Sequence, residues 1–440
     1  MSARRDIIRF AIPVSLQLVC QHSISLLTQV FVAALSDGAV AATGLAAQLS
    51  GIALIGLSSL GSAASIKLSR LQGSEQTQES ARVMWRALVL ALLFGLMAAF
   101  VLLIGAPWCL AALGVQKNVA PLAIRFVRMI AVSIPFLAIS ETCSHLLRAR
   151  GDSRTPMLVG LLAVGIDCAL SATLIPGRWG FPLLGLQGAA LAVIGSRLGA
   201  ALILLGITFR ALWRLDVGLW DSLKDWAALW TDLIQPSGFL ALGHGAWVLG
   251  MTAYAAVYSW LGTSPFAAIQ IVQQIESVGI MFSVGFCAAC LSFVGQALGR
   301  GDETETQRVI SDVLKMVAVL SVLASCSMAT LTLVVQRLYP KLTTETSALV
   351  VSGLLFSALI VPVKIYNMVL ATGVLRTGGD VRFVTLCELM MAVGIACSYV
   401  LGLNLQLGLL GALAGKAIEE MVKLFLFVHR YRSALWIHKL

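Results

Sequence analysis

Four ionisable side chains lie deep inside apolar runs of this sequence, where a charge is costly and a proton or metal cation could be bound. Asp167 lies 13 residues beyond Arg154, and Glu276 lies 12 residues into its run, or about 20 Å and 18 Å along a helix. Lys364 lies a similar distance from Arg376, and Glu388 follows Asp380 by eight residues. An ionisable group near a bilayer centre costs roughly 2.5–3.5 kcal/mol, so such residues face the protein interior or a wet cavity. These four residues are therefore the candidate ion-coupling residues.

Asp167 is the candidate in the first half of the chain. No basic residue lies within a helical turn of it in the sequence. Burial without a positive neighbour favours the uncharged form of a carboxyl group, which makes Asp167 a candidate proton carrier. The alternative is a structural carboxylate that hydrogen-bonds neighbouring helices through Thr28, Gln29 or Ser171.

Lys364 needs a partner of opposite charge in the second half of the chain. Glu276 and Glu388 are the two candidates, because unpaired burial of either sign is far more costly than paired burial. Two interpretations stay open: a permanent structural ion pair, or a pair that opens when its acid takes up a proton.

Further polar side chains within the apolar runs are candidates for lining a cavity between helices. Interhelical hydrogen bonds explain the same residues equally well. His244 follows Pro236 by eight residues and is a weaker candidate of the same kind. The candidate cavity residues are Thr28, Gln29, Ser171, His244, Gln270, Gln274 and Asn367.

The composition indicates a membrane protein. Of the 440 residues, 59% are hydrophobic and only 12% are charged, and the mean hydropathy is +0.91. Soluble domains carry about 25% charged residues, so lipid is the expected solvent. The net charge of +10 comes from basic residues at the ends of the apolar runs, without a basic patch interleaved with aromatics. Nucleic acid is therefore not an expected partner.

The apolar runs predict an all-α fold of twelve transmembrane helices. Each run is long enough to cross a bilayer, which takes about 20 apolar residues. Six runs fall in each half, so the halves share one orientation and are expected to form two six-helix lobes related by a pseudo-twofold axis along the membrane normal. The runs are 7–35, 39–66, 86–113, 119–146, 155–176, 182–209, 233–262, 265–298, 310–336, 344–375, 383–403 and 406–429.

Two short phrases recur in the two halves and indicate a duplication. Residues 147–154 read LRARGDSR, and residues 375–382 read LRTGGDVR, 228 positions later. GLQGA at 185–189 likewise returns as GLLGA at 408–412, at an offset of 223. At helix ends, the glycines permit a turn and the aspartates can cap the following helix. Parallel repeats of this kind are typical of secondary transporters.

Three segments follow from this pattern: an N-lobe at 1–213, an interfacial amphipathic linker at 214–232, and a C-lobe at 233–440. The linker alternates Trp220, Trp226 and Trp230 with charged residues, as expected at a membrane surface. With the N-terminus inside, the short loops place 21 basic residues on the cytoplasmic side and four outside. Both termini are therefore expected in the cytoplasm.

No catalytic constellation is found in the sequence. There is no phosphate-binding loop, HExxH motif, nucleophile triad or pair of catalytic carboxylates, so an enzyme is not expected. The nine cysteines lie almost wholly inside apolar runs, where a thiol behaves as a small apolar group. Cys287 and Cys290 form a CxxC without a neighbouring histidine or a second CxxC, which argues against a metal site. No metal or cofactor is predicted.

Several phrases together resemble the multidrug and toxic compound extrusion (MATE) transporters. They are LRARGDSRTPM, FPLLGLQGAALA, LGTSPFAAIQI, the glycine-spaced run from Gly285 to Asp302, and VLRTGGDVRF. The resemblance covers essentially the whole chain. It implies a two-lobe exporter in which inward movement of a proton or sodium ion drives organic cations or other amphiphiles outward.

The sequence departs from the family pattern in the N-lobe. Thr28 stands where the first helix of the family usually carries an aspartate. In the fifth helix, the usual Asn-x-x-Asn-x-x-x-Asp pattern falls on Val164, Asp167 and Ser171, so the carboxylate has moved one turn. A proton site on one carboxylate is easier to defend here than a cation site built from two.

The sequence thus predicts a cation-coupled antiporter, using protons or sodium, that works by alternating access in the cell inner membrane. The expected partners are the lipid bilayer and small amphiphilic or cationic substrates, and the expected state is a monomer. A lipid-linked saccharide flippase of the same superfamily is the first alternative, and it would favour a more basic central cavity. A non-transporting membrane receptor or scaffold is the second, and it would not need Asp167.

Overall fold

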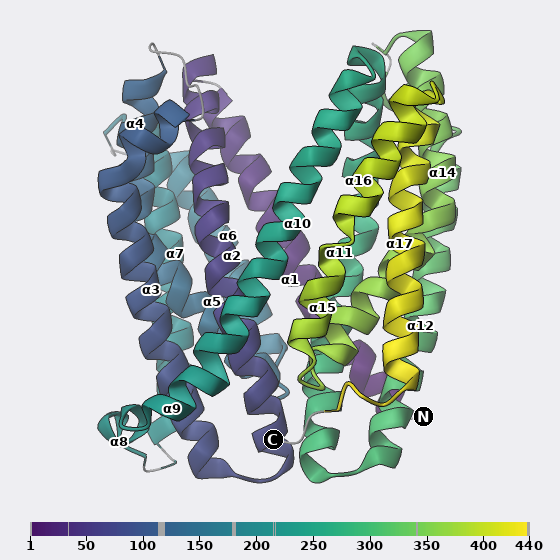
Figure 1. Cartoon of the computed structure of the whole chain (residues 1–440). Coiled ribbons are helices and arrows are strands. Elements are labelled where there is room, and N and C mark those ends of the chain that lie inside the picture. The colour runs from purple at the N-terminus through teal and green to yellow at the C-terminus, as the bar shows by residue number, and fades with distance from the viewer. Residues whose placement is uncertain are drawn as a thin grey trace. The chain divides into compact units, whose positions relative to one another are not determined.

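The described part of the chain is almost entirely helical. The computed structural model describes residues 2–33, 35–112, 119–177, 182–213, 215, 217–339 and 342–437, without the side chains at 2, 3, 22–30, 33, 37, 112, 336 and 338. These residues form long helices and no β-strand (Figure 1). The predicted all-α fold is confirmed.

The helices reproduce the predicted spans. Among the described residues, nine helices are long and apolar enough to cross a membrane, and α4 (Ala120–Ala131) with α5 (Ile134–Ala149), bent by 46°, form a tenth candidate. Together with α1 (Ser2–Ala33) and α17 (Gly408–Arg432), they account for the twelve predicted runs. Two predicted spans each consist of two helices: 119–146 is interrupted at Val132 and Ser133, and 383–403 is interrupted at Leu389 and Met390.

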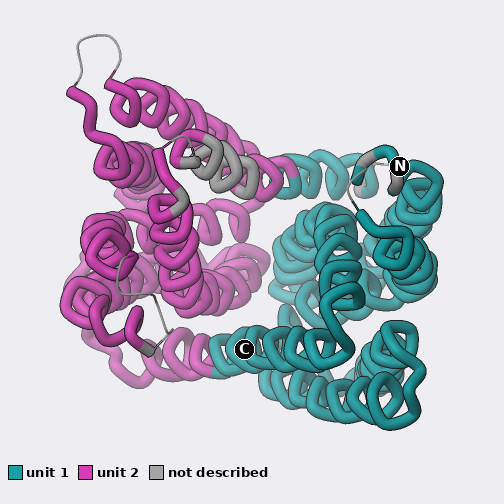
Figure 2. The backbone as a smooth tube through the Cα atoms, turned by 90° about the horizontal axis from the view of Figure 1, so that it is seen from above, with its two compact units in different colours: residues 1–15, 239–440 teal, residues 16–238 magenta. Residues whose placement is uncertain are grey.

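The chain forms two compact units, shown in different colours in Figure 2. Unit 2 comprises residues 16–238 and unit 1 comprises residues 1–15 and 239–440. Whether these units act as the two predicted lobes stays a prediction. Besides α4 and α5, unit 2 contains α2 (Asp37–Gly73), α3 (Thr77–Ala112), α6 (Arg154–Leu174), α7 (Leu186–Trp213), α8 (Leu219–Leu223), α9 (Trp226–Leu229) and the π-helical segment η1 (Trp230–Ile234).

Unit 1 also consists mainly of long helices, and these are interrupted more often than the helices of unit 2. After α10 (Gln235–Trp260), which begins in unit 2, its elements are α11 (Thr263–Arg300), α12 (Glu303–Leu331), α13 (Val335–Leu338), α14 (Thr344–Met368) with η2 (Val369–Leu375), α15 (Val381–Glu388), α16 (Met391–Tyr399) with η3 (Val400–Asn404), and α17. The π-helical segments η2 and η3 follow α14 and α16 directly.

Each unit has a hydrophobic core of its own. The core of unit 2 runs from Val32 to Leu233, and that of unit 1 starts with Ile7 and ends with Trp436. Large apolar side chains also remain exposed along the helices, such as Phe100 at 63% and Leu359 at 73%. A soluble protein would bury them, whereas lipid makes an apolar exterior favourable.

The glycines of the repeated phrases adopt the same backbone conformation in both units. Gly151 and Gly379 adopt φ angles of +90° and +95°. Gly185 and Gly408 have φ angles of +51° and +60°. This left-handed region is accessible to glycine without the steric cost that a Cβ imposes. The echoes therefore mark equivalent turns, which supports the duplication.

The second echo also contains a glycine at a close helix contact. A Cβ on Gly188 would lie 2.7 Å from the carbonyl carbon of Leu174, and one on Gly411 would lie 2.6 Å from the carbonyl oxygen of Leu401. Both glycines thus let a helix start directly against the end of the preceding one.

The aspartates of the first echo differ between the units. Asp152 Oδ1 accepts hydrogen bonds from the backbone N–H groups of Arg154 at 3.1 Å and Thr155 at 3.0 Å, which confirms the predicted cap. Asp380 makes no side-chain cap hydrogen bond and instead accepts one from Arg430 Nε at 2.6 Å. The cap predicted for Asp380 is wrong because an arginine of α17 takes its carboxylate.

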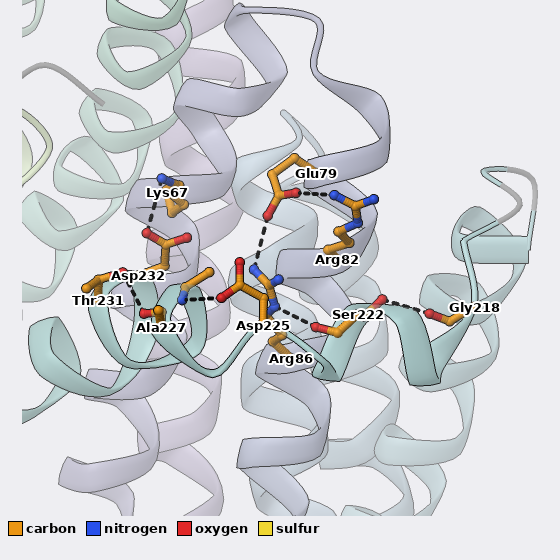
Figure 3. A network of polar contacts seen from close by, with 11 residues as sticks. Lys67, Glu79, Arg82, Arg86, Gly218, Ser222, Asp225, Ala227, Thr231 and Asp232 are labelled. Carbon is orange, nitrogen blue, oxygen red and sulfur yellow. Dashed lines mark hydrogen bonds and ion pairs between the residues drawn. The ribbon is translucent and has the colours of Figure 1, made fainter.

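The segment predicted as a linker is fastened to unit 2 by charged side chains (Figure 3). The guanidinium of Arg86, only 2% exposed, donates to the carbonyl of Ser222 at 2.7 Å and pairs with Glu79 at 3.0 Å. Lys67 pairs with Asp232 at 3.2 Å. These contacts hold α8 and η1 against α2 and α3. Three tryptophans stay 57–79% exposed on this segment, as an interfacial position would require: Trp220, Trp226 and Trp230.

We predict that Gly188→Ala and Gly411→Ala each lower the apparent melting temperature of the detergent-purified protein by several degrees. The added methyl group meets backbone atoms that cannot turn aside, and overpacking of this kind costs about 1–3 kcal/mol. Gly206→Ala in α7 is the matched control, because no atom lies within 4 Å of the position that its added methyl group would occupy. Unchanged melting of both variants would contradict equivalent close contacts in the two units.

Candidate functional site

Unit 2 contains a cavity of about 520 Å³ lined by its own helices. Its wall is mainly apolar, with Leu54, Phe126 and Leu137 among its residues. A volume of this size is within the range of small-molecule sites, which are typically about 300–1,000 Å³. The polar residues of the wall are Gln17, Gln21, Thr43, Ser50, Ser140, Glu141, Ser144, Asp167, Ser196 and Arg197.

Asp167 lies on α6 and faces this cavity. It is 2% exposed and accepts a hydrogen bond from the Ser196 hydroxyl of α7 at 3.4 Å. Arg197, the next residue on α7, interacts electrostatically with the Asp167 carboxylate. The expectation of a carboxylate without a positive neighbour is therefore wrong, because the neighbour comes from another helix and not from the same one.

Glu141 is a second acid on the cavity wall, contributed by α5. It interacts with the guanidinium groups of Arg148 and Arg197 and forms a hydrogen bond with Gln21. Arg148 in turn donates to Gln17 Oε1 at 2.7 Å. Two carboxylates and a guanidinium thus surround one apolar space.

Sequence reasoning missed Glu141 and Arg197. A signal was available, since Arg197 lies 15 residues beyond the start of the run 182–209 and 13 residues before Arg210. By the depth criterion that selected Asp167, it qualifies as an intramembrane charge. Glu141 was masked by its closeness to the arginines of the repeated phrase.

Three predicted neighbours of Asp167 have different outcomes. Ser171 lies one turn further along α6, 1% exposed, and is not part of the cavity wall. The side chains of Thr28 and Gln29 lie outside the described residues, although the backbone there is helical. Their predicted roles stay predictions.

Unit 1 buries an ion pair between α11 and α14. Lys364 Nζ lies 2.6 Å from Glu276 Oε1, and the two side chains are 10% and 8% exposed. Of the two partners considered for Lys364, the structure thus has Glu276. The pair satisfies both charges where water is scarce.

Glu388 has a different partner. Its Oε2 lies 3.1 Å from Lys423 Nζ on α17, and the same ammonium lies 2.6 Å from Glu419. Tyr254 on α10 donates its hydroxyl to the other oxygen of Glu419. Lys423 therefore forms ion pairs with both Glu388 and Glu419.

The remaining charges of α17 extend this network. Asn367 Nδ2 donates to the carbonyl of Glu420 at 2.8 Å and to its Oε2 at 2.9 Å. Lys416 Nζ lies 5.5 Å from the ring centre of Tyr254, and its charge interacts with Glu276 and Glu420. Predicted ion-coupling and cavity residues, Glu276, Lys364 and Asn367, thus belong to one buried network.

The other predicted cavity residues of unit 1 lie apart from these contacts. Gln270 and Gln274 are exposed on α11. His244 on α10 interacts with the guanidinium of Arg376. Their predicted roles in a cavity are not tested by these positions.

The family model MatE matches residues 13–173 and 246–403. These two segments contain most of both units, and each of them includes one copy of the first repeated phrase.

The chain belongs to the MATE family.

This membership confirms the resemblance read from the sequence. A MATE protein is a multi-pass membrane transporter and not an enzyme, so both of these predictions are confirmed. The chain is similar to a probable multidrug resistance protein NorM of Thermotoga maritima, 25% identical over 70% of this chain and 66% of that protein. It is also similar to the uncharacterized transporter YisQ of Bacillus subtilis, 21% identical over 92% of this chain and 89% of that one.

Solved structures agree with the two-lobe fold. The crystal structure of MATE in the bent conformation has a TM-score of 0.90 and 19% sequence identity, and the match covers 99% of this chain and 96% of that one. At this identity the likeness establishes the fold of the MATE protein, while its site chemistry has to be argued from its own residues.

We predict that the Glu276–Lys364 pair behaves as one unit in a double-mutant cycle. Lys364→Met leaves a buried carboxylate unpaired, and removing one partner of a buried pair costs about 3–5 kcal/mol. Adding Glu276→Gln should therefore restore much of the lost melting temperature. Asp312→Asn is the control, since Asp312 pairs with Arg4 outside this network, and its effect should add to that of Lys364→Met. Additive losses in the first cycle would show that the two residues are not partners.

Proposed function

We propose that this MATE protein is a proton-coupled antiporter that exports cationic or other amphiphilic compounds by alternating access. The observation that carries the proposal is the cavity of unit 2, in which Asp167 and Glu141 stand in an otherwise mainly apolar wall. An apolar body fits such a wall, and a positive charge on the cargo is attracted to the carboxylates.

Coupling follows from competition at Asp167. The ionised carboxylate attracts a cation, whereas a proton on the same oxygen removes that attraction. Proton and cargo then exclude each other, so inward passage of one can be exchanged for outward passage of the other. Thr28, Gln29 and Ser171 remain proposed contacts for the proton or the cargo.

The charges of unit 1 favour protons over sodium. The ammonium of Lys364 lies at 2.6 Å from Glu276, so a sodium ion would have to displace it to reach this carboxylate. A proton binds to a single carboxylate oxygen and does not require the ammonium to be displaced first.

Glu276, Lys364 and Glu388 take a second, supporting role in the proposal. Protonation of Glu276 would release Lys364 and thereby loosen the contact between α11 and α14. Gln270, Gln274, His244 and Asn367 are proposed to contribute polar contacts for cargo in unit 1. The transporter is proposed to work as a monomer in the cell inner membrane, with both termini in the cytoplasm.

The name of the Thermotoga relative, a probable multidrug resistance protein, agrees with an amphiphilic cargo. A flippase for lipid-linked saccharides is less well supported, because the cavity wall presents two acids and one arginine. A strongly basic wall would suit a diphosphate better.

We predict that Asp167→Asn abolishes efflux of a fluorescent cation from proteoliposomes under an imposed proton gradient. The amide keeps the shape of the side chain but can neither bind a proton nor attract the cargo charge. Asp152→Asn is the control, since Asp152 caps a helix outside the cavity wall and should retain efflux. Undiminished efflux by Asp167→Asn would end its assignment as the coupling residue.

We also predict that a sodium gradient without a proton gradient drives no efflux in wild-type proteoliposomes. The same fluorescent cation, with an ionophore that clamps the internal pH, measures this directly. Sodium-driven efflux would contradict the argument from Lys364. Absence of efflux of any cation under either gradient would favour the flippase.

A further inference from the structure

Arg197 is the positively charged residue of the cavity wall in unit 2. It projects from α7 into the wall that holds Glu141 and Asp167, and its charge interacts with both carboxylates. Among the residues that the structure describes, however, it forms no ion pair within 4 Å. The guanidinium of Arg197 and the two carboxylates therefore line the same cavity without a direct ion pair between them.

A serine at the break between α4 and α5 fixes the guanidinium. Arg197 Nη1 donates to Ser133 Oγ at 2.7 Å, and Ser133, which is fully buried, donates in turn to the carbonyl of Ile130 at 2.6 Å. The hydroxyl thus acts as donor and acceptor at once, which sets its direction. The guanidinium is held in place before any ligand arrives.

This arrangement leaves hydrogen-bonding capacity on Arg197. A guanidinium has five N–H donors, and the described residues accept one of them, through Ser133. A structural counter-charge at this depth in a transmembrane helix would be expected to form a bidentate pair with a carboxylate. An arginine held short of both acids, on the wall of a cavity, is instead arranged as an anion receptor.

We propose that Arg197 recognises a carboxylate of the cargo, and that this cavity selects amphiphiles carrying both a cationic and an acidic group. The cationic group would lie toward Asp167 and Glu141, the carboxylate would bind Arg197, and the apolar body would contact residues such as Leu54 and Phe126. The inference rests on the proposed function and names its substrate class.

The test compares two dyes that share one aromatic body. Tetramethylrhodamine carries a free carboxylate and is a zwitterion at neutral pH, whereas its methyl ester is a cation. Binding of each dye is measured by fluorescence anisotropy while the detergent-purified protein is titrated into a fixed concentration of dye. A titration with protein-free detergent is subtracted. This readout does not depend on transport.

We expect the wild-type protein to bind the acid about tenfold more tightly than the ester, as one charge-assisted contact allows. Arg197→Gln should remove this preference by weakening the acid alone, and Arg197→Lys should keep part of it. Arg210→Gln is the matched control, an exposed arginine on the same helix outside the cavity wall, and should behave as wild type.

Three results would overturn the inference: no preference for the acid in wild type, an unchanged preference in Arg197→Gln, or equal weakening of both dyes in a variant that still elutes as a single folded species. Equal weakening would mark Arg197 as a structural counter-charge. Failure of the proposed function is distinguishable, since it would appear as binding of the ester without proton-driven efflux of it.

Discussion

The absence of water in the bilayer core is the constraint on which the rest of this structure depends. A charge placed there must find its compensation within the protein. Unit 1 achieves this with direct contacts, as in the 2.6 Å pair of Glu276 with Lys364. Unit 2 places Asp167 and Glu141 beside a cavity and holds Arg197 nearby without an ion pair closer than 4 Å among its described residues. We propose that the charges of this cavity exchange partners during transport.

A duplicated scaffold carries these two solutions. Gly151 and Gly379, at φ angles of +90° and +95°, shape the same turn, and Gly188 and Gly411 permit the same close contact between helices. The two units thus have the same backbone conformation at these turns and helix contacts, where only glycine fits without strain. The buried charges outside these turns differ: Asp167 and Arg197 lie in unit 2, and Glu276 and Lys364 lie in unit 1. The proposed function accordingly gives different roles to two units of similar helical architecture.

The fold was accessible from the sequence because length and apolarity alone decide whether a helix crosses a membrane. The depth of Asp167, Glu276 and Lys364 within their runs likewise marked them as special without any structure. Partners were not accessible in this way. Whether Lys364 meets Glu276 or Glu388 depends on how α14 packs against α11, and Arg197 approaches Asp167 from a different helix. Periodicity along one helix contains no information about such contacts. The break between α4 and α5 lies beside Pro135 in the first turn of α5, a proline that can kink a helix; the length of the apolar run gives no sign of it.

Proton release on cargo binding tests the central claim most directly, because it measures competition at Asp167 without a membrane or a gradient. A fluorescent cation is added to purified protein in weakly buffered detergent solution, at a pH where the site is protonated, and the pH is followed with an indicator. The account predicts release of about one proton per bound cation in the wild type and none in Asp167→Asn. Binding without proton release, or release that persists in Asp167→Asn, would contradict it.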